Sequence, residues 1–249
     1  MVATDSEDEL ALSSSALDAL KQFYAERDAR AEHFAKLHQK AEELHEAATS
    51  QDDSEPKLLS MDAFTEDWNE SQFWYSDECA NFFAKQLLKD ATAETKIAVV
   101  SAPSVFVQLK NILNAADPSQ PKPTIYLLEH DRRFAVFPEF VFYDFAKPTQ
   151  LPEQLKSSIN HLILDPPFLS TDCQTKSALT VSWLLSKEKK PTKLVICTGE
   201  RMQPLIMKLY KNHGIFTTDF EPVHAKGLAN EFYCYANFEC LGWKHKEES

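Results

Sequence analysis

The residues best suited to chemistry are Asp165, Pro166, Pro167 and Phe168, which stand together directly after an apolar run. The two prolines fix φ and have no N–H group, so the loop is stiff and rich in acceptors. The Asp165 carboxylate and the Pro166 carbonyl can each accept a hydrogen from an amine, while Phe168 can form an apolar or cation–π wall. Such a loop predicts transfer of a methyl group from a sulfonium onto a nitrogen whose lone pair it aims. Taken alone, the same four residues are also an ordinary turn.

Acidic residues follow two other apolar runs. Glu129 ends the run Ile125 to Leu128, with Asp131 two residues on, and an acid in this place can accept the hydroxyl hydrogens of a ribose. The pair Asp144 and Phe145 follows Phe140 to Phe142 in the same way. Solvated acids at strand ends are common, so each of these positions by itself supports a structural interpretation equally well.

The turn after the first apolar run contains no glycine. It reads Ser101-Ala102-Pro103-Ser104-Val105, and all four glycines of the chain lie elsewhere. A backbone without glycine approaches a ligand less closely. The hydroxyls of Ser101 and Ser104, and the start of a helix after Pro103, would have to make the contacts instead.

These residues need a sheet to bring them together, and the chain predicts one. Short apolar runs favour five parallel strands, at 97–101, 125–128, 140–142, 161–164 and 194–198. Two C-terminal strands are expected at 215–221 and 232–238, and the last of them is expected to insert antiparallel. Helices are expected at 104–113, 172–185 and 200–212. The link 129–139 contains Pro138 and is too short for a crossover helix, so a single turn or less is expected. The predicted fold is α/β: doubly wound, seven-stranded, mostly parallel and Rossmann-like.

An N-terminal extension precedes this predicted domain. Apolar residues recur at helical spacing from Leu17 to Leu44, which predicts one long amphipathic helix, and the polar, acidic stretch 48–56 predicts a linker. The helix either packs on the catalytic domain or stands in solvent, and substrate docking is the alternative role. We therefore divide the chain into an extension at 1–56 and a catalytic domain at 57–249.

Composition restricts the partners and the compartment. The formal net charge of −12 argues against a protein that grips phosphates over a wide surface, so a basic protein partner is expected and nucleic acid is not. The five cysteines include no CxxC pair and are expected to be reduced, buried thiols. No signal peptide or membrane-spanning run is evident, so we expect a soluble, cytoplasmic protein that does not bind membranes.

Several motifs in the same order resemble one family. The Asp-Pro-Pro-Phe loop resembles the [DNS]-P-P-[YFW] signature of class I amino-methyltransferases. With Val-Ser-Ala-Pro-Ser-Val, Phe-Val-Phe-Tyr-Asp, Leu-Ala-Asn-Glu-Phe and Ser71-Gln72-Phe73-Trp74-Tyr75-Ser76, the chain is similar to the elongation factor 1-alpha lysine methyltransferases from about Phe64 to Trp243.

The resemblance implies an enzyme that methylates a lysine of translation elongation factor 1-alpha with S-adenosyl-L-methionine as cofactor. We expect a monomer, although the sequence leaves the oligomeric state open. The resemblance implies catalytic roles for the Asp165 to Phe168 loop. It also implies cofactor contacts from Ser101, Ala102, Pro103, Ser104, Glu129, Asp131, Asp144, Phe145, Trp74 and Tyr75.

Two other functions remain open at the level of the sequence. A DNA adenine methyltransferase also holds an aryl amine in a Pro-Pro-aromatic loop, after base flipping. A non-catalytic binding protein that kept the fold but lost the cofactor would explain the glycine-free first turn. Donor binding separates the second alternative from an enzyme, and DNA binding separates the first from a lysine methyltransferase.

Overall fold

The computed structural model describes residues 59–61, 64, 72–188, 192–227 and 231–246. The predicted N-terminal helix and linker lie outside the described residues, and so do residues 228–230 of the Leu-Ala-Asn-Glu-Phe motif. The division of the chain at residue 56 therefore stays a prediction.

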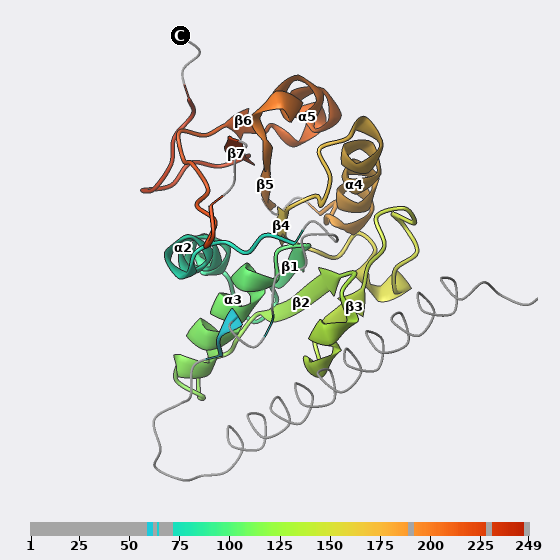
Figure 1. Cartoon of the computed structure of the whole chain (residues 1–249). Helices are drawn as coiled ribbons and strands as arrows, with labels where there is room; N and C mark the ends of the chain where they lie inside the picture. The colour runs from blue at the N-terminus through green and yellow to red at the C-terminus, as the bar shows by residue number, and fades with distance from the viewer. Residues whose placement is uncertain (1–58, 62–63, 65–71, 189–191, 228–230, 247–249) are drawn as a thin grey trace, which may run out of the picture. The chain divides into compact units, whose positions relative to one another are not determined.

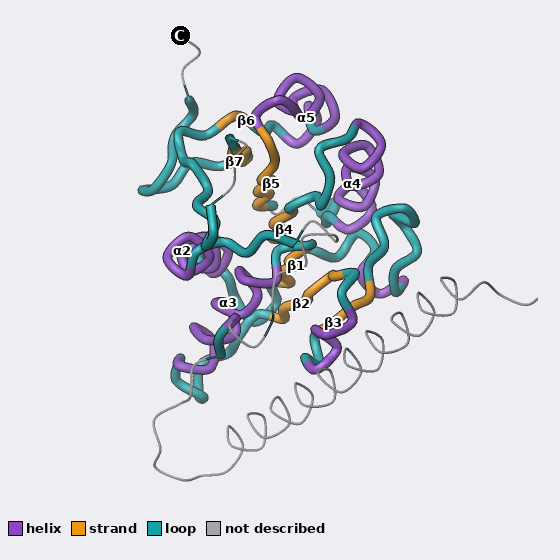
Figure 2. Tube along the Cα trace, viewed as in Figure 1, coloured by secondary structure: helices purple, strands orange, loops and turns teal. Residues whose placement is uncertain are grey.

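A seven-stranded sheet forms the centre of the described domain, in the order β3-β2-β1-β4-β5-β7-β6 (Figures 1 and 2). Its strands are β1 Lys96–Val100, β2 Thr124–Glu129, β3 Phe140–Phe142, β4 His161–Leu164, β5 Lys193–Gly199, β6 Phe216–Thr217 and β7 Phe232–Ala236. Strands β1 to β5 pair in parallel, and β7 lies antiparallel between β5 and β6. The predicted fold class and the antiparallel insertion of the last strand are confirmed.

Helices cover both faces of the sheet, which gives three layers (Figure 1). One face carries α2 Asp77–Leu88 and α3 Pro103–Ala115, and the other carries α4 Thr171–Leu184 and α5 Gln203–Leu209. Because both faces are buried, the parallel strands are apolar along nearly their whole length, as in the fully buried β4. The hydroxyls of Ser76 and Ser170 begin α2 and α4 by accepting N–H bonds from Cys79 and Cys173.

Three predicted elements differ from the structure in extent. The helix expected at 200–212 is divided into 3-10 helices at Glu200–Met202 and Lys211–His213 around α5. The strand expected at 215–221 is only Phe216–Thr217, because the Asp219 N–H turns away to donate to the Lys244 carbonyl. The strand expected at 232–238 ends at Ala236, where the Asn237 side chain bonds to the backbone of the segment that enters β5.

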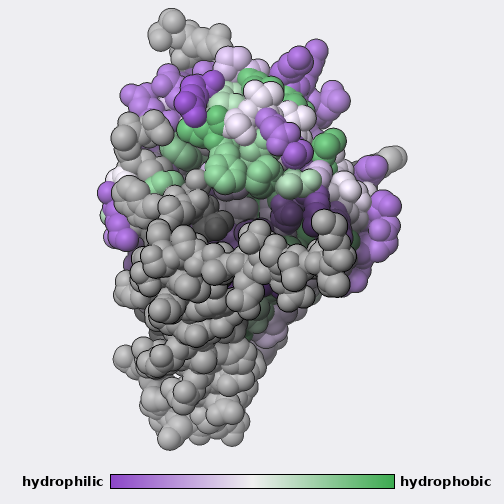
Figure 3. Space-filling model, turned by 45° about the vertical axis from the view of Figure 1, so that its right-hand side comes forward, coloured by the Kyte–Doolittle hydropathy of each residue, from purple (hydrophilic) through white to green (hydrophobic). Residues whose placement is uncertain are grey.

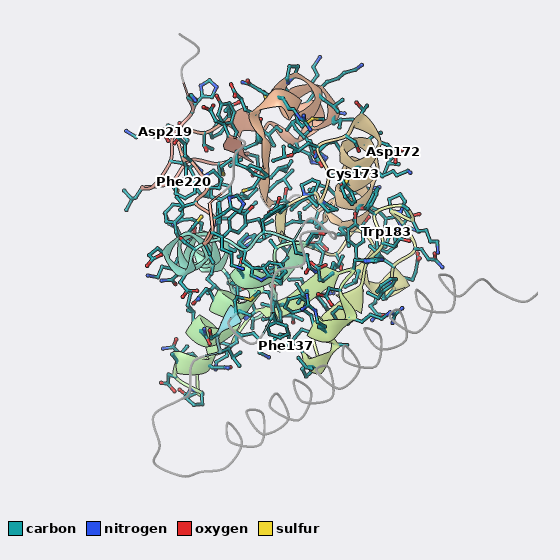
Figure 4. The ribbon with its side chains drawn as sticks, in the orientation of Figure 1. Phe137, Asp172, Cys173, Trp183, Asp219 and Phe220 are labelled. Atoms are coloured by element: carbon teal, nitrogen blue, oxygen red, sulfur yellow. The ribbon has the colours of Figure 1, made fainter. Side chains whose placement is uncertain are left out.

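The link between β2 and β3 contains no α-helix, as predicted, but its five-residue 3-10 helix, Arg132–Val136, is longer than the single turn or less that was expected. The segment after β6 bends over α2, where Phe220 stacks on Phe82 with ring centroids 4.7 Å apart (Figure 4). Cys79, Cys173, Cys197 and Cys234 are buried free thiols as predicted, but Cys240 is partly exposed in the turn before Trp243.

The surface of the described domain is mixed. Figure 3 shows a patch of apolar side chains bordered by hydrophilic ones. The large apolar residues that are exposed are Phe142, Phe168, Leu179, Met207, Val223 and Leu241. Of the helices in the described part of the chain, none combines the length and apolarity that crossing a bilayer requires.

Candidate active site

The sheet topology places the predicted residues at one edge. β1 neighbours both β2 and β4, so the strand order reverses between β1 and β4, and ligands of open α/β sheets bind beyond the carboxyl ends at such a point. The Ser101 N–H donates to the Leu128 carbonyl at 2.9 Å, and the Asp165 N–H donates to the Val100 carbonyl at 3.0 Å. The ends of β1, β2 and β4 are thereby held side by side.

Asp165 has an asymmetric environment. Its Oδ2 accepts a hydrogen bond of 2.6 Å from the Tyr75 hydroxyl, while its Oδ1 has no hydrogen-bond partner among the described residues. Burial raises the pKa of Asp165 to about 7, the Tyr75 bond lowers it, and the nearby Glu129 charge raises it. The site therefore contains a desolvated carboxyl group with one oxygen committed and one available.

The rest of the proline loop is held by polar side chains from other elements. Gln174 of α4 donates from Nε2 to the Phe168 carbonyl at 3.1 Å and to Thr198 Oγ1 of β5 at 3.0 Å. Arg201 donates to the Leu169 carbonyl at 3.2 Å. The Phe168 ring remains 39% exposed, with its face at 63° to Phe145 and the ring centroids 5.5 Å apart. A rigid loop thus presents one open aromatic ring.

The glycine-free first turn is achieved with an uncommon backbone conformation. Ser101 has φ of 54°, a left-handed value that glycine adopts far more readily than serine. Ala102 begins α3 without a side-chain cap, and Pro103 occupies the first turn, where its missing N–H costs nothing. Ser104 is buried at the same helix start. The serine provides the tight turn that a glycine would provide.

Glu129 closes β2 with a buried carboxyl group. Its Oε1 accepts N–H bonds from His130 at 2.8 Å and Asp131 at 3.2 Å, whereas its Oε2 has no hydrogen-bond partner in the described part of the chain. Burial raises the pKa of Glu129 to about 7, against the two N–H bonds, which lower it. Glu129 therefore has an acceptor oxygen to offer a ligand at this edge.

The two remaining predicted acids are placed differently. Asp131 is tied on both oxygens: Oδ1 accepts from the Arg133 N–H, and Oδ2 bonds Arg133 and Gln72 at 2.7 and 2.9 Å. These bonds hold the pKa of Asp131 below its usual value despite burial, which raises it. Asp144 caps the turn after β3 by accepting from the Ala146 N–H at 2.9 Å.

The two predicted aromatic residues, Trp74 and Tyr75, are both buried. The Trp74 indole N–H donates to the Phe64 carbonyl at 3.3 Å, and its ring meets Phe134 edge-on at 88°. Trp74 therefore packs in the core on the α2–α3 face, whereas the hydroxyl of Tyr75 reaches Asp165.

Three supporting residues could not be identified as such from the sequence: Gln72, Gln174 and Arg133. Gln174 left a weak signal, because it is a polar residue on the buried stripe of α4 that also contains Cys173, Ser177 and Val181. Gln72 left none, since its partners Asp131 and Arg133 are 59 and 61 residues away in the chain. Arg133 also bonds Asp131, two residues away, but nothing in the sequence distinguishes that pair from two charged neighbours in a turn.

Comparison with known proteins identifies relatives over most of the chain. A family described as "Probable N6-adenine methyltransferase" matches residues 66–240. The protein-lysine N-methyltransferase EFM5 of Saccharomyces cerevisiae is 42% identical over 94% of both chains. The EEF1A lysine methyltransferase 1 of Gallus gallus is 37% identical over 94% of this chain and 96% of the relative. A protein-(glutamine-N5) methyltransferase structure from Alicyclobacillus acidocaldarius aligns with TM-score 0.39 and 10% identity over 64% of this chain and 91% of that one.

Proposed function

Because this chain belongs to the family of elongation factor 1-alpha lysine methyltransferases, we propose that it methylates a lysine side chain of that factor. S-adenosylmethionine is the methyl donor of this enzyme class. The observation that carries the proposal is Asp165 at the β1–β4 switch, with Oδ2 fixed by Tyr75 and Oδ1 open. This arrangement suits a group that orients a nitrogen.

The residues at the strand ends fit the methyl donor. When bound, S-adenosylmethionine supplies an electrophilic methyl group on a positively charged sulfur. Glu129 has an oxygen free for a ribose hydroxyl, and the uncapped start of α3 after Ser101 suits a carboxylate. Asp144 and Phe145 follow the end of β3, where the resemblance implies contacts to the adenine of the donor. Asp131, whose oxygens are both taken, would support this side by holding the 3-10 helix.

The proline loop orients the amine. Asp165 Oδ1 and the Pro166 carbonyl can each accept one amine hydrogen, which leaves the nitrogen lone pair directed away from the loop. Phe168 then borders the aliphatic stem and the head of the lysine, since its ring is exposed and backed by Phe145. Positioning of this kind lowers the barrier because the reacting atoms are held at near-attack distance.

The substrate lysine must be neutral to attack, so its pKa must be lowered when it is buried in the site. A free lysine has a pKa of about 10.4, and the charge of Asp165 would raise it further. Desolvation against Phe168 and the positive charge of the bound donor act in the opposite direction.

Charge supports a protein substrate over a nucleic acid. The net charge of −12 opposes binding of a polyanion and favours encounter with a basic protein. The family description mentions adenine, whereas the relatives of 37–42% identity are protein-lysine methyltransferases. A monomer acting in the cytoplasm completes the proposal.

The test is transfer of a labelled methyl group. Purified protein is incubated with radiolabelled S-adenosylmethionine and, separately, with elongation factor 1-alpha, DNA or RNA. We expect label on a lysine of the factor, located by mass spectrometry, and none on nucleic acid. Label on adenine would replace this function with the nucleic-acid alternative, and donor binding without any transfer would indicate a binding protein.

A further inference from the structure

Tyr75 reaches the active site from outside the sheet. It lies just before α2, yet its hydroxyl is 2.6 Å from Asp165 Oδ2 at the end of β4, 90 residues later in the chain. Resting on the function proposed above, we propose that Tyr75 is a positioning residue that fixes the rotamer and the ionised form of Asp165. This role concerns the methyl acceptor, not the donor.

The packing around Tyr75 leaves its hydroxyl little freedom. The side chain is 3% exposed, and its ring contacts Phe83 at 5.5 Å and His224 at 4.9 Å between centroids. Its backbone forms an antiparallel bridge with His224. On either side, Ser76 N–H donates to the Val223 carbonyl and Ala225 N–H to the Trp74 carbonyl, both at 2.9 Å. Moving the hydroxyl would disturb two segments at once.

The contact divides the two oxygens of Asp165 between two tasks. Because Oδ2 is held by Tyr75, rotation of the carboxyl group would break a short bond, so Oδ1 keeps a constant direction. Oδ1 and the Pro166 carbonyl are then the acceptors left for the amine. Burial raises the pKa of the Tyr75 phenol well above its usual value, so this hydroxyl stays protonated and remains a donor.

The other groups that face Asp165 do not stabilise its charge. Burial raises the pKa of Asp165, and so does Glu129 of β2. Burial also raises the pKa of the Cys79 and Cys197 thiols on α2 and β5, and the charge of Asp165 raises both further, so these thiols stay neutral beside it. Among the described residues, the Tyr75 hydroxyl alone lowers the pKa of Asp165. Removing it should therefore raise the pH at which Asp165 ionises.

The first measurement compares Tyr75→Phe with Tyr210→Phe. Tyr210 is equally buried, but its hydroxyl has no hydrogen-bond partner among the described residues. For Tyr75→Phe we expect kcat toward elongation factor 1-alpha to fall by roughly ten-fold or more, since the lost bond involves a charged group. The acid limb of its pH profile should move to higher pH, whereas Tyr210→Phe should retain the wild-type profile. Equal loss at every pH would overturn the proposal.

A double-mutant cycle separates positioning from a direct contact with the donor. If Tyr75 acts through Asp165, Tyr75→Phe adds little in an Asp165→Asn background, and donor affinity by calorimetry changes little. Multiplicative losses, or a large loss of donor affinity, would assign Tyr75 to the donor site instead. Should Tyr75→Phe fold poorly, 3-fluorotyrosine at position 75 keeps the ring and strengthens the donor, and the acid limb should then move to lower pH.

One readout does not depend on the substrate. In protein labelled with carbon-13 at aspartate carboxyls, the Asp165 signal is assigned by its loss in Asp165→Asn. Its titration midpoint should rise in Tyr75→Phe and stay unchanged in Tyr210→Phe. An unchanged midpoint in both variants refutes the positioning role. If wild-type protein labels no elongation factor while this midpoint shifts, the proposed function fails and the positioning role survives.

Discussion

Two loops that follow neighbouring strands are stabilised in opposite ways. The turn after β1 is local: Ser101 adopts a left-handed φ of 54°, and α3 starts with no side-chain cap. The loop after β4 is held by side chains from outside it, with the distant Tyr75 at Asp165 and Gln174 of the following helix α4 at the Phe168 carbonyl. In the function proposed above, the side that binds the donor therefore depends on the backbone, and the side that binds the amine depends on tertiary contacts.

The difference has a functional reason. A helix start binds an anionic ligand through backbone N–H groups, so its side chains can vary. A nitrogen must be aimed by particular acceptor atoms, and a small misplacement of those atoms is costly.

The largest expected effect tests whether the loop after β4 contributes to the transfer step and not to donor binding. Asp165→Asn should lower kcat by about a hundred-fold, because an amide accepts the amine hydrogen less strongly and one of its two groups is a donor. Donor affinity should change by only a few-fold. Steady-state methylation and calorimetry measure both. Full turnover in this variant would remove Asp165 from the mechanism.

A smaller effect tests whether tertiary contacts hold that loop. Gln174→Leu leaves the Phe168 carbonyl without its donor and should lower the free energy of unfolding by about 1–3 kcal/mol. It should also reduce kcat more than donor affinity. Gln108→Leu, which loses only an exposed bond to Asp77, is the control and should stay within roughly 0.5 kcal/mol. Chemical denaturation of both variants provides the comparison, and equal effects would contradict it.

The pH dependence of stability sharpens the contrast further. Burial raises the pKa of Asp165 from 3.8 to about 7, so the folded state binds this proton more tightly than the unfolded chain does. The resulting stabilisation is complete below about pH 4 and is lost as the pH rises through 7. The free energy of unfolding of Asp165→Asn, relative to that of the wild type, should therefore rise by on the order of 1 kcal/mol as the pH increases from 5.5 to 8.5. Denaturant midpoints that run parallel across this range would refute the shift.

Glu129 should behave in the same direction. Burial raises the pKa of Glu129 from 4.5 to about 7, so the wild-type protein also loses stability from this group as the pH rises through 7. Glu129→Gln, which cannot ionise at this position, should not show that part of the loss. The two variants differ in function, however. Glu129→Gln should weaken donor binding, whereas Asp165→Asn should mainly slow transfer.

The smallest effect concerns the first turn. Ser101→Gly relieves the left-handed conformation but makes the unfolded chain more flexible, so stability should change by less than about 1 kcal/mol. Ser101→Val places a β-branched residue at a φ it avoids and should cost about 1–2 kcal/mol. Donor affinity should be retained in Ser101→Gly. A large loss in that variant would show that the Ser101 hydroxyl itself contacts the donor.

The sequence by itself determined the strands and their mostly parallel arrangement, and it indicated the stiff, acceptor-rich loop from Asp165 to Phe168 whose catalytic role stays a prediction. These features have local causes: runs of apolar residues buried on both faces, and prolines that fix φ whatever surrounds them. It also located Glu129 and the glycine-free turn. The sequence did not predict how short β6 is, because hydrogen bonds from the C-terminal segment end this strand. It also did not predict that the last helix is divided, with a 3-10 helix on each side of α5.

Only the tertiary structure decided which oxygen of Asp165 is available and which residues hold the loop. Tyr75 and Asp165 are 90 residues apart, and Gln72 and Asp131 are 59 apart, so no local pattern relates either pair. The segment that carries Tyr75 is fixed by its bridge to His224, and Asp165 and Asp131 are fixed by the strand order β2-β1-β4. A hydrogen bond depends on distance and angle between two atoms, and for residues this far apart only the folded chain sets both.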